Sequence, residues 1–336
     1  MYTLALETSC DETSAAVIED GRIIRSNIIS TQIPVHRKFG GVVPEIASRH
    51  HIENVIPIIE EALKEAGITL AEVDHIGVTY GPGLVGALLV GVAAAKALSF
   101  GAGIPLVGVH HMEGHIFANF LSHPELEPPF VSLVVSGGHT QLVLVEDYNT
   151  FSLLGQTRDD AAGEAFDKIA RVMGYPYPGG PFIDKLAAQG DPDAVAFPKA
   201  LIEKHNFEFS FSGLKSAVIN YIHNQEQKKI EYSHADVAAG FQRAVVETLV
   251  EKAMAAMEEN GLKKLVLAGG VSANQGLRTA LERACRDRSI SLYMPDLILC
   301  TDNAAMIGCR AYYMAQAEKF ADLTLNAKPS LPIGQY

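Results

Sequence analysis

Two segments of the chain resemble one another, and this internal repeat constrains the fold more than any other feature. Residues 4–20 read LALETSCDETSAAVIED, and residues 132–147 read SLVVSGGHTQLVLVED. The alignment places identical residues at matching positions: Leu6 with Leu133, Ser9 with Ser136, Thr13 with Thr140, and Glu19-Asp20 with Glu146-Asp147. Each segment has an apolar run, a turn of small or polar residues and a second alternating run, which predicts a β-hairpin. A hairpin that opens each half predicts two similar lobes facing each other across a cleft.

Each half also contains a predicted strand, a glycine turn and a predicted helix. In the first half, VDHIGVTYGPG (73–83) predicts a strand and a turn, followed by an apolar helix over 84–100. In the second half, KKLVLAGGVSANQGLRTALERA (263–284) predicts a strand over 264–268 and a helix from about 274. Strand-then-helix units are typical of α/β lobes.

Three glycine turns are candidates for binding an anion: SGGHT (136–140), PGGP (178–181) and AGGVSAN (268–274). A turn without bulky side chains can present several backbone N–H groups to a phosphate. Each of these turns, taken singly, is equally compatible with a plain hairpin or loop.

Composition limits the class of protein. The chain has 336 residues, 48% hydrophobic and 20% charged, which is typical of a soluble globular protein with room for two lobes. The segment at the N-terminus lacks the basic start of a signal peptide. The longest apolar run, residues 81–95, is shorter than the ~20 residues that span a bilayer, so we expect a buried helix and no membrane.

Cysteines and net charge give two further expectations. The four cysteines contain no C-x-x-C pair, so we expect reduced thiols in the cytoplasm. A net charge of −12 opposes broad affinity for nucleic acid, since phosphate contacts need lysine and arginine. A nucleic-acid partner would therefore need a local basic patch or a helper protein.

The stretch VHHMEGHIF (109–117) contains a candidate metal site. His111 and His115 are four residues apart, so on a helix both imidazoles share one face. In zinc peptidases of the H-E-x-x-H type, the glutamate directly follows the first histidine and acts as general base. Met112 holds that position here, and Glu113 would point roughly 200° away from His111. The spacing therefore disfavours a metallopeptidase but remains compatible with a metal site that has a third ligand elsewhere.

A set of motifs then occurs in one colinear order: ETSCDETS (7–14), GGVVPEIASRHH (40–51), GPGLVGALLVG (81–91), HHMEGH (110–115), VSGGHTQL (135–142), DDAAGEAFDK (159–168), YPGGP (177–181), FSFSGLKSA (209–217), GGVSAN (269–274) and CTDNAAMIG (300–308). Over about residues 3–330, this order resembles the bacterial tRNA N6-adenosine threonylcarbamoyltransferase family, once labelled O-sialoglycoprotein endopeptidase. The resemblance implies a two-lobed α/β fold of the actin/Hsp70/sugar-kinase-like (ASKHA) type with an interlobe cleft. We expect an N-terminal lobe of residues 1–120 plus a C-terminal helix at about 312–330, and a C-terminal lobe of residues 121–311.

The resemblance also implies an activity and its site residues. The implied reaction moves threonylcarbamoyl from threonylcarbamoyl-AMP to N6 of adenosine 37 in tRNAs that read codons beginning with adenine. Asp302 corresponds to the family's third metal ligand beside His111 and His115, although an aspartate there also suits an N-cap. The implied metal is one divalent ion, iron(II) or alternatively zinc, since two imidazoles and a carboxylate suit both.

Further roles carry over by position. Asp11 and Glu12 correspond to activity-supporting residues. The implied ligand in the cleft is an adenine nucleotide or threonylcarbamoyl-AMP, and the residues expected to bind it are Val134, Val135, Ser136, Gly137, Gly138, Asp167, Gly180, Asp184 and Asn274. The implied partners are a tRNA anticodon loop, a non-catalytic paralogue of the same fold and a small P-loop ATPase. Candidate phosphate contacts are His36, Arg37, Lys38, Arg49, His50, His51, Lys199, Lys204 and Lys215.

Two other readings remain open at this point. An ATP-dependent phosphotransferase of the same fold would explain the glycine turns and the repeat but would give the histidine pair no task. A non-catalytic nucleotide-gated binding module would need none of the metal-binding residues, and their presence disfavours it.

Overall fold

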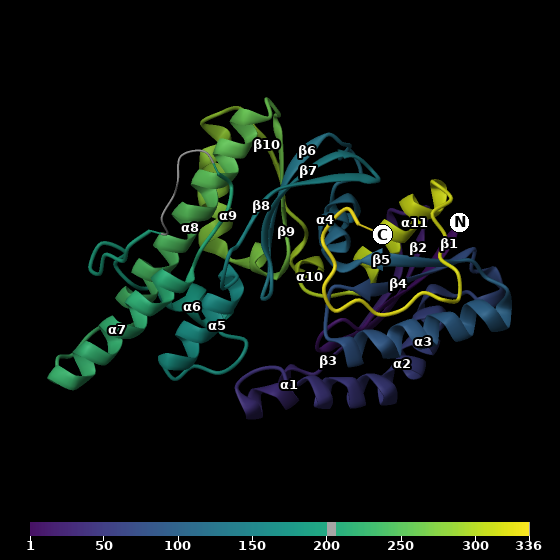
Figure 1. The fold of residues 1–336 in the computed structure, drawn as a ribbon, viewed down its shortest axis with the longest axis horizontal. Helices are drawn as coiled ribbons and strands as arrows, with labels where there is room; N and C mark the ends of the chain where they lie inside the picture. The colour runs from purple at the N-terminus through teal and green to yellow at the C-terminus, as the bar shows by residue number, and fades with distance from the viewer. Residues whose placement is uncertain (200–205, 336) are drawn as a thin grey trace. The chain divides into compact units, whose positions relative to one another are not determined.

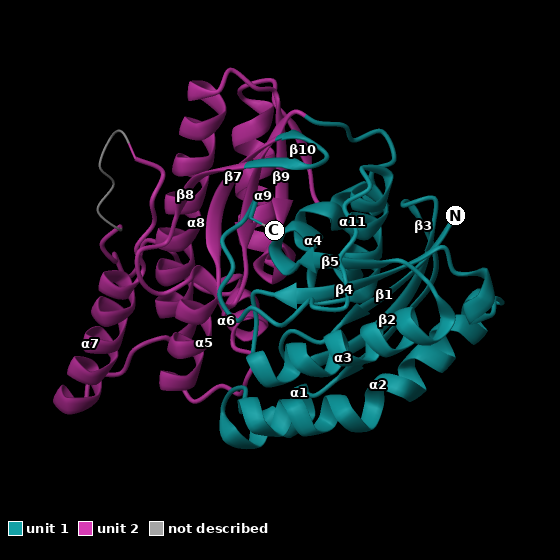
Figure 2. Cartoon of the chain, turned by 45° about the vertical axis from the view of Figure 1, so that its right-hand side comes forward, with its two compact units in different colours: residues 1–128, 146–151, 295–336 teal, residues 129–145, 152–294 magenta. Residues whose placement is uncertain are grey.

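The computed structural model describes residues 1–199 and 206–335, which form two compact units (Figures 1 and 2). Unit 1 contains residues 1–128, 146–151 and 295–336, and unit 2 contains residues 129–145 and 152–294. Residues 295–311 therefore lie in unit 1, whereas the sequence placed them in the second lobe. The reason is helix α11 (Ala304–Gln316), which packs on the first sheet and begins earlier than the helix expected at about 312–330.

Unit 1 is built on a five-stranded sheet with the order β3-β2-β1-β4-β5. Its strands are β1 (Tyr2–Glu7), β2 (Glu12–Glu19), β3 (Ile23–Thr31), β4 (His75–Gly81) and β5 (Leu106–His110). β1 to β3 form an antiparallel meander, whereas β4 and β5 run parallel to β1.

Helices cover both faces of this sheet. Side chains along a strand alternate between the two faces, and both sets are apolar here, so each face is buried by helices. Leu4 and Leu6 point to the face covered by α2 (Pro44–Ala66) and α3 (Val85–Ala102), which lie side by side in Figure 1. Ala5 points to the opposite face, covered by α4 (His111–Ser122) and α11. The short helices of this unit are α1 (Ile33–His36), η1 (Arg37–Phe39), η2 (Leu70–Glu72) and α10 (Leu297–Cys300).

Unit 2 has a second five-stranded sheet with the order β8-β7-β6-β9-β10. Its strands are β6 (Phe130–Val135), β7 (Thr140–Asp147), β8 (Thr150–Gln156), β9 (Lys264–Ala268) and β10 (Ser291–Tyr293). One apolar core joins this sheet to its helices, which are α5 (Ala162–Val172), α6 (Gly180–Ala187), α7 (Ser212–Lys228), α8 (His234–Glu259), the 3₁₀ turn η3 (Gly270–Ala273) and α9 (Gln275–Arg286).

The two sheets repeat the same topology, which confirms the predicted duplication. In both, an antiparallel hairpin is flanked by a third strand on one side and by two parallel strands on the other. The register also agrees, since Leu6 lies opposite Ala15 in the first hairpin and Leu133 lies opposite Leu142 in the second. The predicted strand over 264–268 and the helix after 274 are confirmed as β9 and α9.

The apolar helix α3 is only partly buried. One side of it packs in unit 1 through Ala87, Leu88, Gly91, Val92, Ala95 and Ser99. On the other side Leu89 is 44% exposed and Phe100 is 78% exposed. The expectation of a buried helix is therefore correct for one face of α3 and wrong for the other. Within the described residues, α3 alone is long and apolar enough to cross a membrane. One such helix is weak evidence for a membrane span, because core helices of globular proteins meet the same criteria.

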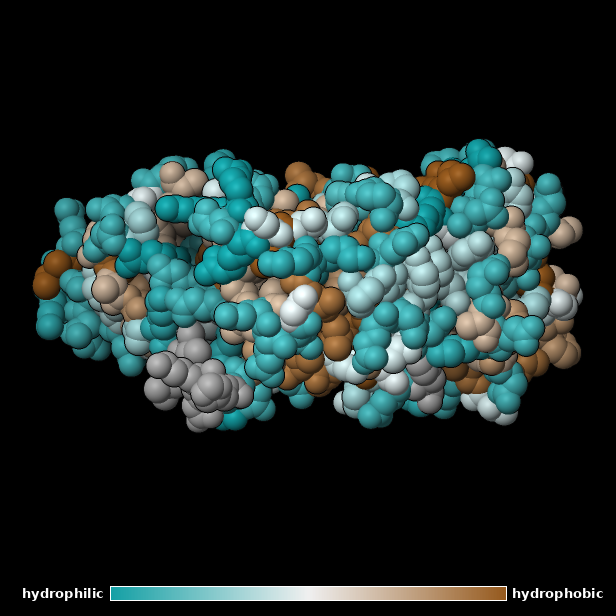
Figure 3. Space-filling model, turned by 90° about the horizontal axis from the view of Figure 1, so that it is seen from above, coloured by the Kyte–Doolittle hydropathy of each residue, from teal (hydrophilic) through white to brown (hydrophobic). Residues whose placement is uncertain are grey.

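The surface is otherwise mixed in character. On the face drawn in Figure 3, hydrophilic residues cover most of the area, and hydrophobic residues appear as separate patches. Such scattered apolar residues are normal on soluble proteins and indicate no binding site by themselves.

Candidate metal centre and nucleotide-binding turns

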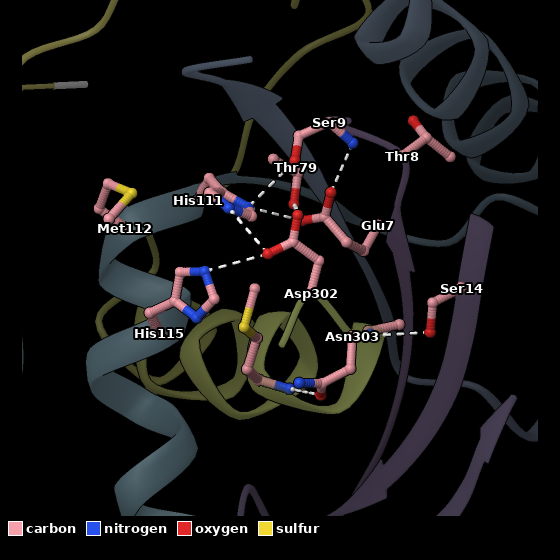
Figure 4. Close-up of polar contacts among 12 residues, drawn as sticks. Glu7, Thr8, Ser9, Ser14, Thr79, His111, Met112, His115, Asp302 and Asn303 are labelled. Carbon is pink, nitrogen blue, oxygen red and sulfur yellow. Dashed lines mark hydrogen bonds and ion pairs between the residues drawn. The ribbon is translucent and has the colours of Figure 1, made fainter. Parts of the chain in front are cut away.

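The histidine pair lies at the start of helix α4, directly after strand β5. His110 is the N-cap residue, and its Nδ1 accepts a hydrogen bond from the Met112 backbone N–H at 3.1 Å. This cap starts the helix at His111, so His111 and His115 lie one turn apart on the same face. Their rings are buried, with centroids 4.7 Å apart (Figure 4). The predicted pairing of the two imidazoles on one helix is confirmed.

Asp302 reaches the two histidines from the loop before α11. Its Oδ1 lies 3.4 Å from His111 Nε2 and 3.1 Å from His115 Nε2. The N-cap task that an aspartate here can perform belongs to Asn303, whose Oδ1 accepts from the Met306 N–H at 3.0 Å. Asp302 is therefore not occupied with capping, and the ligand atoms of the three residues lie within 4.8 Å of one another.

The protonation preferences of this group fit a cation. Burial lowers the pKa of His115, which keeps its imidazole neutral and able to coordinate. Burial would raise the pKa of Asp302, but the two neighbouring imidazoles outweigh it and hold that pKa below its ordinary value. Burial alone would lower the pKa of His111, yet the carboxylates of Asp302 and Glu7 raise it, so a cation would displace a proton there.

His115 supplies a second indication of fit. Its Nε2 is buried and lies 3.1 Å from Asp302 Oδ1, while its buried Nδ1 has no hydrogen-bond partner among the described residues. A neutral imidazole nitrogen that faces a carboxylate in this way can share a metal ion with it. Two imidazoles and a carboxylate with room for further ligands form a set that suits iron(II) or zinc.

The turn of the first hairpin carries Asp11 and Glu12 close to this group. Both residues are buried, and the Glu12 carboxylate accepts a hydrogen bond from Thr31 Oγ1 at 3.1 Å. Burial raises the pKa of Glu12, and the negative charges of Asp11 and Asp302 raise it further. Glu12 is therefore a group that retains a proton above the usual range of a glutamate.

Helix α2 holds the same turn from the side. His51 lies with Nδ1 2.8 Å from Thr13 Oγ1, and its Nε2 donates to the Cys10 carbonyl at 2.9 Å. His51 is fully buried, as is His36, which pairs with Gln32. The expectation that these two histidines contact phosphates is wrong, because the amphipathic packing of α2 and the α1 turn directs both rings inward.

Most other candidate phosphate contacts have acidic partners. Arg49 pairs with Glu45, His50 lies 3.8 Å from Glu53, Lys199 pairs with Glu247 and Glu251, and Lys215 pairs with Asp160. Arg37 and Lys38 are exposed. Lys204 lies outside the described residues.

The second hairpin presents backbone rather than side chains. Val134 and Val135 are fully buried in β6, where Val134 pairs with Gln141 of β7 and Ala268 of β9, so neither side chain is open to a ligand. In the turn that follows, Ser136 Oγ accepts from the His139 N–H at 3.1 Å. Gly137 and Gly138 have open space where a Cβ would stand, which leaves their backbone accessible.

The other predicted nucleotide-binding residues all hold backbone in place. Asp167 Oδ1 accepts from the Gly179 N–H at 2.6 Å, which fixes the loop before Gly180 at the start of α6. Asp184 Oδ2 accepts from the Gln275 N–H at 2.9 Å, and Asn274 caps α9.

Gln242 of α8 is a residue that the sequence analysis missed. Its Nε2 donates to Asp184 Oδ1 at 3.1 Å, and its Oε1 accepts from Asn274 Nδ2 at 2.8 Å. It therefore connects two predicted nucleotide-binding residues from helices far apart in the sequence. A glutamine within a long apolar helix was the available signal, but its partners depend on tertiary packing.

Comparison with known proteins agrees with this geometry. The model of the TsaD family, described as tRNA N6-adenosine threonylcarbamoyltransferase, matches residues 23–309. A protein of that name from Moorella thermoacetica is 58% identical over 330 residues, covering 98% of this chain and 96% of the relative. Another from Clostridioides difficile is 56% identical over 335 residues, covering 100% and 99%.

Solved structures agree with the fold. HypF from T. kodakarensis superposes with a TM-score of 0.65 at 14% identity, covering 94% of this chain and 48% of that one. Component A of (R)-2-hydroxyglutaryl-CoA dehydratase from Acidaminococcus fermentans gives 0.55 at 16% identity, covering 94% and 99%. The expected ASKHA-type α/β fold is confirmed. By its family match and its full-length relatives, the chain belongs to the tRNA N6-adenosine threonylcarbamoyltransferase family.

Proposed function

We propose that the chain transfers the threonylcarbamoyl group of threonylcarbamoyl-AMP to N6 of adenosine 37 in tRNAs that read codons beginning with adenine. The observation that carries this proposal is the convergence of His111, His115 and Asp302 in a chain of this family. A phosphotransferase is the less favoured function, because it would leave this buried group without a task and the relatives carry another name.

The proposed cofactor is one divalent ion, iron(II) or alternatively zinc, held by His111 Nε2, His115 Nε2 and Asp302. When bound, such an ion supplies Lewis acidity to an oxygen that gains negative charge. The protein's own part is to keep His115 neutral by burial and to hold Asp302 as a carboxylate.

The transfer forms a bond from N6 of adenosine to the carbamoyl carbon and breaks the bond from that carbon to the phosphate oxygen of AMP. N6 must also lose a proton. Asp11 and Glu12 lie in the hairpin turn near Asp302, and we propose them as the groups that handle protons there. A phosphate oxygen of the substrate is the alternative acceptor.

The nucleotide part of the donor is assigned to unit 2. The backbone of Ser136, Gly137 and Gly138 is open to an anion, and turns of this kind favour phosphate. Asp167, Gly180, Asp184 and Asn274 would surround the ribose and adenine, with Val134 and Val135 contributing backbone.

The proposed macromolecular partners follow from charge and surface. A tRNA anticodon loop offers an unstacked adenine, but the net charge of −12 disfavours tight binding of RNA by this chain alone. An apolar groove of about 440 Å³ lies between α2 and α3, and its lining residues are Ile52, Val55, Gly86, Leu89, Val90, Ala93 and Ala94. We propose that a non-catalytic paralogue docks there, that a small P-loop ATPase joins the complex, and that the complex works in the cytoplasm.

The test is incubation with threonylcarbamoyl-AMP and unmodified tRNA, with any partners required, followed by nucleoside analysis for threonylcarbamoyladenosine. Replacement of His111 and His115 by alanine should reduce product formation by more than about 100-fold, because several kcal/mol of charge stabilisation is lost. The variant protein should remain folded by circular dichroism. Wild-type turnover by a folded, metal-free double variant would sink the proposal.

A further inference from the structure

Glu7 is a completely buried acid with no role in the function proposed above. It is the last residue of β1, and its side chain is fully excluded from solvent. A buried carboxylate is costly unless it is hydrogen-bonded or paired. Glu7 has three such contacts. Its Oε1 accepts from the Ser9 N–H at 2.5 Å, and its Oε2 accepts from Thr79 Oγ1 at 2.6 Å and lies 3.0 Å from His111 Nδ1 (Figure 4).

These contacts orient one of the two metal-binding imidazoles. His111 Nδ1 lies 3.0 Å from Glu7 Oε2 and 3.2 Å from the neutral hydroxyl of Ser9, while His111 Nε2 faces Asp302. A carboxylate at Nδ1 keeps the ring proton on that nitrogen, so the Nε2 lone pair is directed to the metal position. His115 differs, since its Nδ1 has no hydrogen-bond partner among the described residues. The site therefore has one imidazole with a polar partner at both ring nitrogens, and one whose Nε2 faces Asp302 while its Nδ1 has no partner among the described residues.

The surroundings of Glu7 fix the position of the carboxylate. Thr79 belongs to the neighbouring strand β4, and Ser9 is held in turn by the Leu84 N–H, which donates to the Ser9 carbonyl at 2.8 Å. Both donors would persist without the histidine. The sheet and the hairpin turn therefore fix the Glu7 carboxylate independently of its contact with His111.

Charge gives a second argument. A divalent ion would bring two positive charges into a buried site, and uncompensated buried charge is strongly disfavoured. Glu7 adds a carboxylate in direct contact with His111, beside Asp302 and the nearby Asp11. An uncharged residue at position 7 would leave less negative charge around the ion.

We propose that Glu7 is a positioning residue, which fixes the tautomer of His111 and adds negative charge beside it, and so raises the affinity of the site for divalent metal. This inference rests on the proposed metal centre. Partners of this kind typically account for a 10- to 100-fold effect on metal affinity.

The Glu7→Gln variant tests the role with almost no change in shape. Glutamine has one oxygen and one NH₂, whereas both carboxylate oxygens of Glu7 accept hydrogen bonds. If the glutamine NH₂ faced the Ser9 N–H, two hydrogen-bond donors would oppose each other, because a backbone N–H cannot accept. The NH₂ is therefore expected to face His111 and draw the ring proton to Nε2, which blocks the metal-binding nitrogen.

The experiment measures Zn²⁺ and Fe²⁺ affinity by chelator competition, together with the proton NMR signal of the His111 Nδ1–H in the zinc-loaded protein. For E7Q we expect affinity about 10- to 100-fold lower and loss of that hydrogen-bonded signal. The matched control is E113Q, a second fully buried glutamate on α4 that pairs with Arg310 at 2.8 Å. E113Q should be less stable but should keep the wild-type metal affinity and the signal.

Each outcome decides something. Wild-type affinity in folded E7Q, or an equal loss in E113Q, overturns the role of Glu7 while leaving the metal centre intact. Failure of the wild-type protein to bind either ion overturns the metal centre itself. Should E7Q not fold, Thr79→Val decides instead, since it removes one donor to Glu7 Oε2 and should weaken metal binding by about 2- to 10-fold. Wild-type affinity in T79V would then overturn the inference.

Discussion

At the scale of single residues, burial makes the stability of the protein sensitive to the pH through His75, which lies outside the candidate metal centre. His75 begins β4, is 1% exposed, and its Nε2 lies 2.7 Å from Thr3 Oγ1. Burial lowers the pKa of His75 to about 4. The folded protein therefore keeps this ring neutral at pH values where the unfolded chain, with a pKa near 6.5, already binds a proton.

This difference predicts that acid destabilises the protein through His75. Between pH 6.5 and 4 the unfolded state binds more protons, so the free energy of unfolding falls as the pH falls. The contribution of His75 is about 3 kcal/mol over that window. Chemical denaturation at a series of pH values should show a shallower slope for His75→Gln than for the wild type. Identical slopes would contradict the prediction.

At the scale of elements, a close approach between β6 and the turn after β9 requires glycine. Gly269 has φ of +88°, and a Cβ on it would lie 2.4 Å from the Val135 carbonyl oxygen. Gly270, the next residue, has nothing within 4 Å of the same position. Position 269 therefore requires glycine, whereas the adjacent position 270 has space for a side chain.

A pair of alanine variants measures that difference. Gly269→Ala should lower the free energy of unfolding by about 1–3 kcal/mol, because the backbone is strained and the strands must separate. Gly270→Ala should change it by less than about 0.5 kcal/mol. Urea unfolding of both variants provides the measurement, and similar values for the two would refute this account.

Elements with a strong local pattern could be predicted from the sequence. The strand over 264–268 and the helix after Asn274 follow from an apolar run, a glycine turn and a capping residue, all local signals. The pairing of His111 with His115 likewise needs only helical spacing. Glu7 and Gln242 could not be assigned, because their partners are distant in sequence and become neighbours only when the sheets and helices pack.

The expectations from the sequence were wrong mainly where polar residues expected at the surface are buried. The run of basic residues and histidines around His36 and His51 resembles a solvated patch, yet both rings lie in the interior. The boundary of the second lobe was also misplaced. The expected second lobe extended to residue 311, whereas the loop before α11 lies in unit 1 and carries Asp302 to the histidines of α4.

At the scale of the whole molecule, the α2–α3 groove predicts a docking surface. Leu89 lines it and is 44% exposed, so a glutamate there would place a charge in the proposed contact with a paralogue. Leu89→Glu should weaken that complex about 10- to 100-fold, as loss of a central apolar contact does. Isothermal titration calorimetry with the paralogue gives the measurement. Leu153→Glu, at an exposed leucine of β8, is the matched control and should bind normally.

The duplicated hairpin has a consequence for electrostatics. The same backbone path carries Cys10, Asp11 and Glu12 in its first copy and Gly137, Gly138 and His139 at the aligned positions of its second. Acid side chains repel anions, whereas bare amides attract them. The same hairpin shape thus has opposite electrostatic potentials in its two copies. Exchanging the two tripeptides would therefore move the proposed phosphate-binding turn from one half of the chain to the other.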